Sequence, residues 1–403
     1  MKKVYIVAAK RTPLGSFGGT LTSVPAPQLG SHVIKAALAQ AQLDPSLVEE
    51  VIVGNVLSAG QGMGPGRQAA LNAGIPATTP AYTLNMICGS GMKTVIESFT
   101  KIKAGMADIM VAAGIENMSQ APFMMSANNR FGHKMGSQQI EDSIIKDGLT
   151  DVFNQYHMGI TAENIAEQYQ ISREQQDAFA ARSQMRACNA IEAGKFIDEI
   201  APLEVVQRKG TITFANDEYP RQDTTAESLA KLRPAFKKDG TVTAGNASGI
   251  NDGAVAFILA SEQAVAEHGL TPLAEIVSCG QGGVDPSVMG LGPVPAIKQA
   301  LQQAQLELKD MQLLELNEAF AAQAIGVMHG LSEEHDLPLT WFDDKTNVNG
   351  GAIALGHPLG ASGGRVLATL LYEMNKQQLE YGVASLCIGG GMGTAIIIKR
   401  CDN

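Results

Sequence analysis

An internal repeat of one helical segment constrains the fold of this chain most. Residues 34–43 read I-K-A-A-L-A-Q-A-Q-L and residues 297–306 read I-K-Q-A-L-Q-Q-A-Q-L, identical at eight of ten positions. The apolar spacing of both segments predicts amphipathic helices. Chance similarity is the alternative interpretation, because helix preference alone can make two alanine- and glutamine-rich segments alike.

The sequence that follows each copy favours a true duplication. A short acidic linker and an apolar strand come next, at residues 51–53 and 313–316, and each strand leads to an asparagine, Asn55 or Asn317. The segments S-G-M-K and S-G-G-R then open a helix in each half, and a buried strand follows. We therefore expect an α/β protein of two related halves. Strand ends from both halves would meet at a shared seam, where a site can form.

The middle of the chain differs from both copies in composition and helix signals, and we expect an inserted loop domain over residues 119–247. The N-terminal half is then residues 1–118 plus 248–270, and the C-terminal half is residues 271–403. Within the insertion a Ser172-x-x-Gln175 capping box begins a predicted helix. We expect Cys188 in the core, on an apolar stripe of that helix with Ala178, Ala181, Met185 and Ile191.

Charge narrows the classes of partner. The chain has a formal net charge of -10, which argues against nucleic acid or an anionic membrane surface as a partner. Residues 208–238 carry seven basic and four acidic side chains, which could receive a phosphate-bearing ligand, although such a run is more often a solvated face. No stretch approaches the roughly 20 apolar residues of a membrane span.

The cysteines and glycine runs argue against other classes of site. The five cysteines form no C-x-x-C pair and no framework spacing, so we expect no metal site, no disulfide scaffold and a reducing, cytoplasmic location. The first apolar run ends too early, at Lys10, for a secretory signal. Gly389 to Gly393 lies too near the C-terminus for a dinucleotide-binding unit, and no P-loop motif occurs.

Cys88 is the first candidate catalytic residue. An extended apolar segment, residues 82–87, precedes it, and a helical pattern follows Gly89-Ser90-Gly91. A nucleophile at such a sharp turn resembles a nucleophile elbow. Unpaired N–H groups at a helix N-terminus favour the thiolate. We therefore expect a nucleophilic Cys88 whose thiol pKa is lowered.

The second half supplies three polar clusters, each at a strand end or in a glycine-rich turn, around Asn317, His357 and Cys387. His357 lies in the run N-G-G-A-I-A-L-G-H-P-L-G-A-S-G, where small residues let the backbone approach a ligand. It is the best candidate base. A cysteine paired with a histidine can perform covalent catalysis, and a second cysteine can move another proton.

These motifs together resemble the thiolase family over nearly the whole chain and in the family's order. They are N-M-I-C-G-S-G-M, Y-H-M-G-I-T-A-E-N, G-N-A-S-G-I-N-D-G-A, N-E-A-F-A, the His357 run and C-I-G-G-G-M-G. The resemblance implies a thiolase-like fold of duplicated α/β/α/β/α layered halves with an inserted loop domain. It also implies a homotetramer built as a dimer of dimers.

The resemblance further implies catalytic roles. Cys88 takes an acyl group from a CoA thioester, His357 activates it, and Cys387 moves the other proton. One oxyanion site consists of His357 and a water held by Asn317. The other consists of the backbone N–H groups of Cys88 and Gly389, and each donor is worth roughly 10²- to 10³-fold in rate.

A set of substrate- and CoA-binding residues follows from the same resemblance. It comprises His157, Met158, Arg221, Ser228, Phe236, Ala244, Ser248, Ala319 and Phe320. Ser248 would contact the pantetheine arm, and Phe236 and Phe320 would line its tunnel. No cofactor is expected, because the substrates themselves carry coenzyme A.

The C-G-S-G sequence at Cys88 and the His157-Met158 pair resemble the short-chain, biosynthetic thiolases. The implied activity is that of a transferase that condenses two acetyl-CoA to acetoacetyl-CoA and CoA, reversibly, by ping-pong Claisen chemistry through acetyl-Cys88. A degradative 3-ketoacyl-CoA thiolase of broad chain length is the alternative. A silent acyl-CoA-binding protein is a third possibility, against which the filled catalytic positions argue. A β-ketoacyl-carrier-protein synthase would have a histidine or asparagine in place of Cys387.

Overall fold

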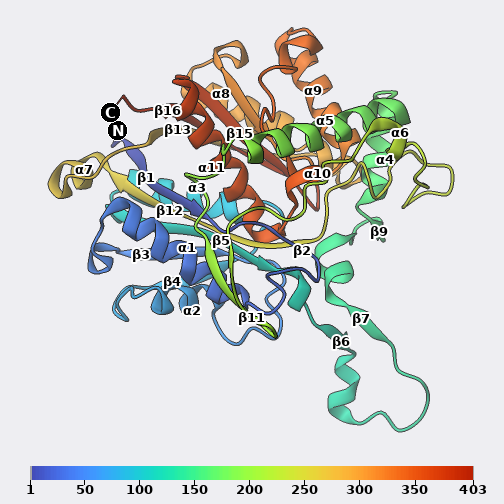
Figure 1. Ribbon diagram of the computed structural model, residues 1–403, viewed down its shortest axis with the longest axis horizontal. Coiled ribbons are helices and arrows are strands. Elements are labelled where there is room, and N and C mark those ends of the chain that lie inside the picture. The colour runs from blue at the N-terminus through green and yellow to red at the C-terminus, as the bar shows by residue number, and fades with distance from the viewer. Residues whose placement is uncertain (1, 403) are drawn as a thin grey trace.

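A 10-stranded sheet runs through the molecule in the computed structural model, which describes residues 2–402 (Figure 1). Its strands are β1 (Val4–Arg11), β2 (Gly15–Ser16), β3 (Glu50–Gly54), β4 (Ala81–Leu84), β5 (Ile109–Asn117), β12 (Asn251–Ser261), β13 (Ala274–Gly283), β14 (Leu313–Leu316), β15 (Tyr381–Ile388) and β16 (Met392–Arg400). The order is β14-β15-β16-β13-β1-β12-β5-β3-β4, with β2 beside β12.

The sheet consists of two equivalent halves that join where β1 pairs with β13. Outward from the join, β12 and β16 are antiparallel to their inner neighbours, and β5 and β15 are antiparallel to those strands. The next strands, β3 and β14, are parallel to β5 and β15. An isolated parallel bridge between Leu314 and Thr346 stands where β4 stands in the first half. The predicted duplication is therefore confirmed.

Helices complete a five-layer arrangement. The outer face of the first half is covered by α1 (Ala26–Ala41) and α2 (Pro65–Asn72), and that of the second by α8 (Pro293–Ala304) and α9 (Ala321–His335). Between the halves lie α3 (Ser90–Lys103) and α11 (Leu359–Gln377), which pack on one another (Figure 1). The layered fold predicted from the family resemblance is confirmed.

The repeated helices α1 and α8 end in the same way. Gln42 and Gln305 both adopt the left-handed conformation, with φ of 50° and 56°. The next residue, Leu43 or Leu306, donates its N–H back to a helix carbonyl at 3.0 or 3.1 Å. This C-terminal cap satisfies carbonyls that the helix leaves unpaired, and it explains why the repeat extends through the final Q-L.

The inserted region contains short elements rather than a third layered unit. They are β6 (Phe123–Met125), β7 (Ile140–Asp142), β8 (Thr150–Asp151), β9 (Tyr156–His157), α4 (Gly159–Gln168), α5 (Arg173–Glu192), β10 (Leu203–Gln207), β11 (Gly210–Phe214) and α6 (Ala226–Leu229). Two further short helices are α7 (Glu262–His268) and α10 (Ala352–Leu355). The β6–β7 arm projects away from the layers (Figure 1). The domain boundaries given above stay a prediction.

The buried face of α5 is not the one predicted. Cys188 is half-buried, and Met185 is exposed. The buried positions include Gln176, Asp177 and Ser183, because this helix holds neighbouring loops by hydrogen bonds rather than by apolar contact alone. The Ser172–Gln175 capping box is present as predicted. Over the described residues, 2–402, no helix is both long and apolar enough to cross a membrane.

Candidate active site

One cavity of about 320 Å³ brings the two halves and the insertion together. Cys88 from the first half, His357 and Cys387 from the second, and His157 from the insertion all line it. The prediction that residues of both halves form one site is therefore confirmed for the two cysteines, which line the same cavity. Within residues 2–402, no group of three or more His, Cys, Asp or Glu side chains is placed to hold a metal ion.

Cys88 lies in a tight turn and not directly at the end of a strand. The strand β4 stops at Leu84, so the predicted extension through residue 87 is wrong. Ile87 has a φ of 47°, an unfavourable conformation for a β-branched residue. The Asn85 carboxamide accepts the Ile87 N–H at 2.9 Å, and the Ser90 hydroxyl donates to the Ile87 carbonyl at 2.7 Å. These polar groups hold the turn that presents Cys88 before α3.

Burial dominates the acidity of Cys88. It raises the pKa of the thiol to about 11, although the backbone N–H groups of Gly389 and of Cys88 itself act in the opposite direction. The predicted lowering of this pKa is wrong, because the side chain is only 4% exposed and loses more from desolvation than it gains from the N–H groups. Cys88 is therefore a neutral thiol that needs a base.

His357 is held at its backbone N–H and at one ring nitrogen, Nδ1. Its N–H donates to the Asn251 carboxamide at 2.9 Å. Its Nδ1 lies 2.6 Å from the Ser362 hydroxyl and 3.5 Å from the Asn317 amide nitrogen, whereas its buried Nε2 has no hydrogen-bond partner. Burial and the Arg365 charge lower the pKa of His357 to about 3. The imidazole is therefore neutral and able to accept a proton.

Cys387 is the second buried thiol. It is the next-to-last residue of β15, and the glycines after Ile388 turn the chain into β16, with Gly390 and Gly391 at φ of 89° and 85°. Such angles favour glycine. Burial, followed by the neighbouring Cys88, raises the pKa of the Cys387 thiol. Both cysteines are thus protonated in this state.

Most residues predicted to bind substrate line the same cavity. They are His157, Met158, Phe236, Ala244, Ser248, Ala319 and Phe320. The His157 and Phe236 rings stack with centroids 4.5 Å apart, and Phe236 meets Phe320 edge-on at 6.0 Å. These rings form an apolar wall that suits the arm of a thioester substrate.

Four of the predicted site residues do not line the cavity. Asn317 lies behind His357 and Gly389 contributes its N–H toward Cys88. Arg221 is exposed and lies over the Tyr219 ring, 5.6 Å from its centroid. Ser228 is exposed, and its hydroxyl donates to the Thr225 carbonyl in the cap of α6. The structure does not bring Ser228 to the cavity.

Sequence reasoning missed several residues that line the cavity. They include Met118, Ile145, Leu149, Tyr219, Ile250 and Met289. Met118 follows the fully buried strand β5, so the end of that apolar run was a usable signal. Met289 comes from a short 3₁₀ helix, Pro286–Leu291, of the second half, and its sequence carries no sign of a site.

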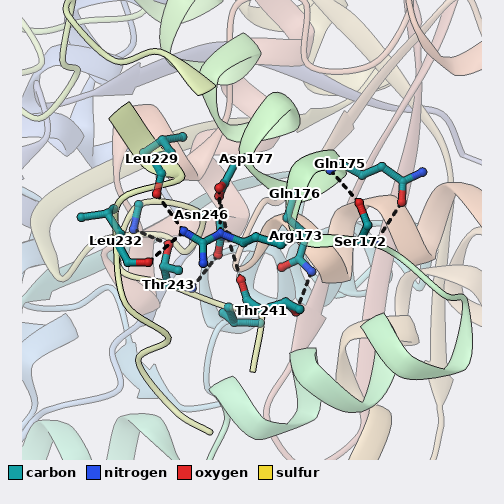
Figure 2. A network of polar contacts seen from close by, with 12 residues as sticks. Ser172, Arg173, Gln175, Gln176, Asp177, Leu229, Leu232, Thr241, Thr243 and Asn246 are labelled. Atoms are coloured by element: carbon teal, nitrogen blue, oxygen red, sulfur yellow. Dashed lines mark hydrogen bonds and ion pairs between the residues drawn. The ribbon is translucent and has the colours of Figure 1, made fainter. Parts of the chain in front are cut away.

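Figure 2 shows how α5 fixes the chain that leads into the cavity wall. Asn246 donates to the Asp177 carboxylate at 2.9 Å, and Gln176 donates to the Thr241 hydroxyl at 2.8 Å. Arg173 pairs with the same Asp177 at 2.7 Å. Residues 244, 247 and 248, which line the cavity, lie within or next to this tethered loop. These contacts therefore tie the insertion's part of the cavity wall to α5.

Comparison with known proteins gives full-length matches. The thiolase N-terminal domain matches residues 4–263, and the thiolase C-terminal domain matches residues 270–400. Acetyl-CoA acetyltransferase of Chromobacterium violaceum is 55% identical and covers 99% of this chain and 100% of its own. A probable acetyl-CoA acyltransferase of Staphylococcus aureus is 52% identical, with 99% and 100% covered.

Solved structures agree with the sequence matches. Human mitochondrial 3-ketoacyl-CoA thiolase is 49% identical with a TM-score of 0.94, over 100% of this chain and 99% of that one. The Bacillus anthracis acetyl-CoA acetyltransferase is 43% identical with a TM-score of 0.95, over 100% and 99%.

Proposed function

The chain belongs to the thiolase family and is an acyltransferase, and from this premise we propose that it condenses two acetyl-CoA to acetoacetyl-CoA and CoA, reversibly. The observation that carries the proposal is one cavity lined by two neutral thiols and a neutral imidazole, Cys88, Cys387 and His357. Such a set carries no charge in the resting state of a buried site, and its members can exchange protons during the reaction.

The first half-reaction transfers acetyl to Cys88. The thiol proton moves to His357 Nε2 as the Cys88 sulfur attacks the thioester carbonyl. The resulting oxyanion is stabilised by the protonated His357 and by a water on Asn317, whose Oδ1 is buried and without a partner. The carbonyl then re-forms, and the leaving CoA sulfur takes the proton of Cys387. Acetyl-Cys88, CoA and a Cys387 thiolate beside an imidazolium remain.

The second half-reaction forms the carbon–carbon bond. The Cys387 thiolate removes an α-proton from a second acetyl-CoA, and the carbanion attacks the acetyl carbon on Cys88. Backbone N–H groups of Cys88 and Gly389 lie at the sulfur, where they support the oxyanion. The Cys88 sulfur leaves with the proton of His357, which restores all three groups. The two half-reactions together give a ping-pong cycle.

The acyl-chain length of the substrates that the enzyme cleaves distinguishes this proposal from the second candidate function. The second candidate is a degradative 3-ketoacyl-CoA thiolase of broad chain length, and the similarity to human mitochondrial 3-ketoacyl-CoA thiolase is the observation that keeps it. The test is the rate of CoA-dependent cleavage of acetoacetyl-CoA, 3-ketohexanoyl-CoA and 3-ketodecanoyl-CoA, followed by loss of substrate absorbance. Cleavage of acetoacetyl-CoA alone supports the short-chain enzyme, and comparable rates on all three support the degradative one.

We also propose a homotetramer, assembled in part through the β6–β7 arm. Its exposed apolar side chains include Phe131 at 87% and Met135 at 90% exposure. Exposure of such large apolar side chains to water is unfavourable unless a partner covers them. Because oligomers of identical subunits are usually symmetric, a second copy of the chain is the natural partner.

We propose that the enzyme works in the cytoplasm and without a bound cofactor or metal. All five cysteines are free, which suits a reducing compartment. The chemistry above uses only side chains, backbone N–H groups and water. Activity on acetoacetyl-CoA should therefore survive dialysis against a chelator in a magnesium-free assay, and loss of activity that added metal restores would refute this part. Cell fractionation tests the location.

A further inference from the structure

We infer that Ser362 is a positioning residue that fixes His357 in the tautomer with its proton on Nδ1 and its lone pair on Nε2. The inference rests on the proposed function in taking His357 as the base for Cys88. Ser362 lies in α11, and none of the catalytic or binding roles described above is assigned to it. Two short contacts of one hydroxyl group carry it.

The Ser362 Oγ atom lies close to two atoms at once. It is 2.6 Å from His357 Nδ1 and 2.8 Å from the Pro358 carbonyl oxygen. Both distances are normal for hydrogen bonds, and each bond needs one proton between its heavy atoms. A carbonyl oxygen has no proton to give, so the Ser362 hydroxyl must donate to Pro358. The proton in the other contact must then come from His357 Nδ1.

The opposite arrangement leaves one contact without a proton. If the hydroxyl donated to Nδ1, the Ser362 and Pro358 oxygens would face each other at 2.8 Å with lone pairs only. His357 would also carry a proton on Nε2, which is buried and has no hydrogen-bond partner. A buried unsatisfied N–H costs about 1–3 kcal/mol. Protonated Nδ1 avoids both penalties.

This tautomer also decides what the Asn317 amide can bind. A protonated Nδ1 cannot accept the Asn317 N–H, whose nitrogen is 3.5 Å away, so the amide stays available for the oxyanion water. Loss of the Ser362 hydroxyl would change that, because Asn317 could then donate to an unprotonated Nδ1. The proton would move to Nε2, and the ring would no longer accept the proton of Cys88. A wrong histidine tautomer is very damaging in enzymes that use this kind of base.

Ser362 is well placed to enforce the choice. It is 1% exposed and lies in the first turns of α11, where its own N–H also donates to the Pro358 carbonyl. Two hydrogen bonds thus fix Ser362 relative to the residue after His357. When His357 becomes an imidazolium during acylation, the same Nδ1–H bond becomes charge-assisted and stronger.

Alkylation of Cys88 by iodoacetamide tests the inference without any CoA substrate. The rate at neutral pH is measured by peptide mass spectrometry, so that modification of Cys387 is counted apart. We expect Ser362→Ala to react about 10- to 100-fold more slowly than the native chain, the range seen when a metal-bound histidine loses the hydrogen-bond partner of its other ring nitrogen. Ser362→Thr, which keeps the hydroxyl, should recover most of the rate.

Ser98→Ala is the matched control. Ser98 is also a buried helical serine, but its hydroxyl has no hydrogen-bond partner, so its loss should leave alkylation unchanged. Native alkylation by Ser362→Ala would overturn the inference. Should Ser362→Ala fail to fold, the native chain still decides. Its ¹⁵N-histidine spectrum, assigned with His357→Asn, should show a protonated Nδ1 and an unprotonated Nε2, and the reverse pattern would refute the inference.

The outcomes separate this inference from the proposed reaction. A chain that does not cleave acetoacetyl-CoA, yet shows the Ser362 dependence and the Nδ1–H tautomer, would retain the inference and lose the proposed function. A chain that cleaves acetoacetyl-CoA but has its His357 proton on Nε2 would retain the proposed function and lose the inference.

Discussion

Ile388 occupies the space that a side chain at Gly89 would need: a Cβ there would lie 2.3 Å from Ile388 Cδ1. The two residues come from opposite halves of the molecule, and each follows a cysteine that lines the cavity. The cysteine loops therefore interlock, and packing across the seam requires a glycine after Cys88.

The contact between Gly89 and Ile388 predicts that a smaller residue at 388 restores activity to a Gly89 variant. Gly89→Ala should lower acetoacetyl-CoA cleavage by at least tenfold, because overpacking of this size costs about 1–3 kcal/mol and displaces Cys88. Ile388→Val removes the Cδ1 atom alone, so the double variant should recover part of the lost rate. A double variant no better than Gly89→Ala would show that Ile388 is not the cause.

The two perturbed pKa values predict a distinctive pH profile. Since burial raises the thiol pKa of Cys88 to about 11, alkylation of His357→Asn should rise by about tenfold per pH unit up to that value. The native chain should react faster at neutral pH and depend less on pH, because His357, with its pKa lowered to about 3, stays unprotonated throughout and keeps a lone pair for the Cys88 proton. A variant that levels off below pH 9 would show that the helix N-terminus outweighs burial. The exposed His268→Asn serves as the control.

A buried ion cluster predicts a stability effect. The Arg11 guanidinium pairs with Asp217 at 2.7 Å and with Glu199 at 2.6 Å, all fully buried. Asp217→Asn should lower the free energy of unfolding by about 3 kcal/mol, because it leaves part of a buried charge uncompensated. Urea unfolding at fixed protein concentration measures this, with the exposed Asp223→Asn as control. Equal midpoints for the two variants would contradict the expectation.

The projecting arm predicts a change of assembly. Phe131→Ser combined with Met135→Ser should reduce the mass in solution from that of a tetramer, since both side chains are almost fully exposed in the single chain. Light scattering after size-exclusion chromatography gives the mass directly. An unchanged mass would remove the arm from the tetramer interface.

Much of this fold could be predicted because local signals and the repeat agree. The helix ending in Q-L recurs in α1 and α8, and each copy is followed by a parallel strand of the same sheet. Even the serines that begin the repeated S-G segments act alike. Ser90 and Ser362 each donate a hydroxyl to a carbonyl three or four residues earlier, at 2.7 and 2.8 Å.

What the sequence could not show depends on long-range burial. The helix N-terminus after Cys88 suggested a thiolate, yet burial in the folded chain raises the pKa of the Cys88 thiol to about 11. The apolar stripe with Cys188 was misleading because the other face of α5 is bound by polar loops from residues 229–246. Met289 reaches the cavity only through the tertiary fold.

Acetyl transfer in the absence of a second substrate tests the central claim most directly. The native chain is mixed with acetyl-CoA, quenched in acid, and its peptides are mapped by mass spectrometry, beside Cys88→Ala and Cys387→Ala. We predict acetyl on Cys88 in the native chain, slower acetylation of the same residue in Cys387→Ala, and none in Cys88→Ala. Acetyl on Cys387, or no acetylation of the native chain, would contradict the account.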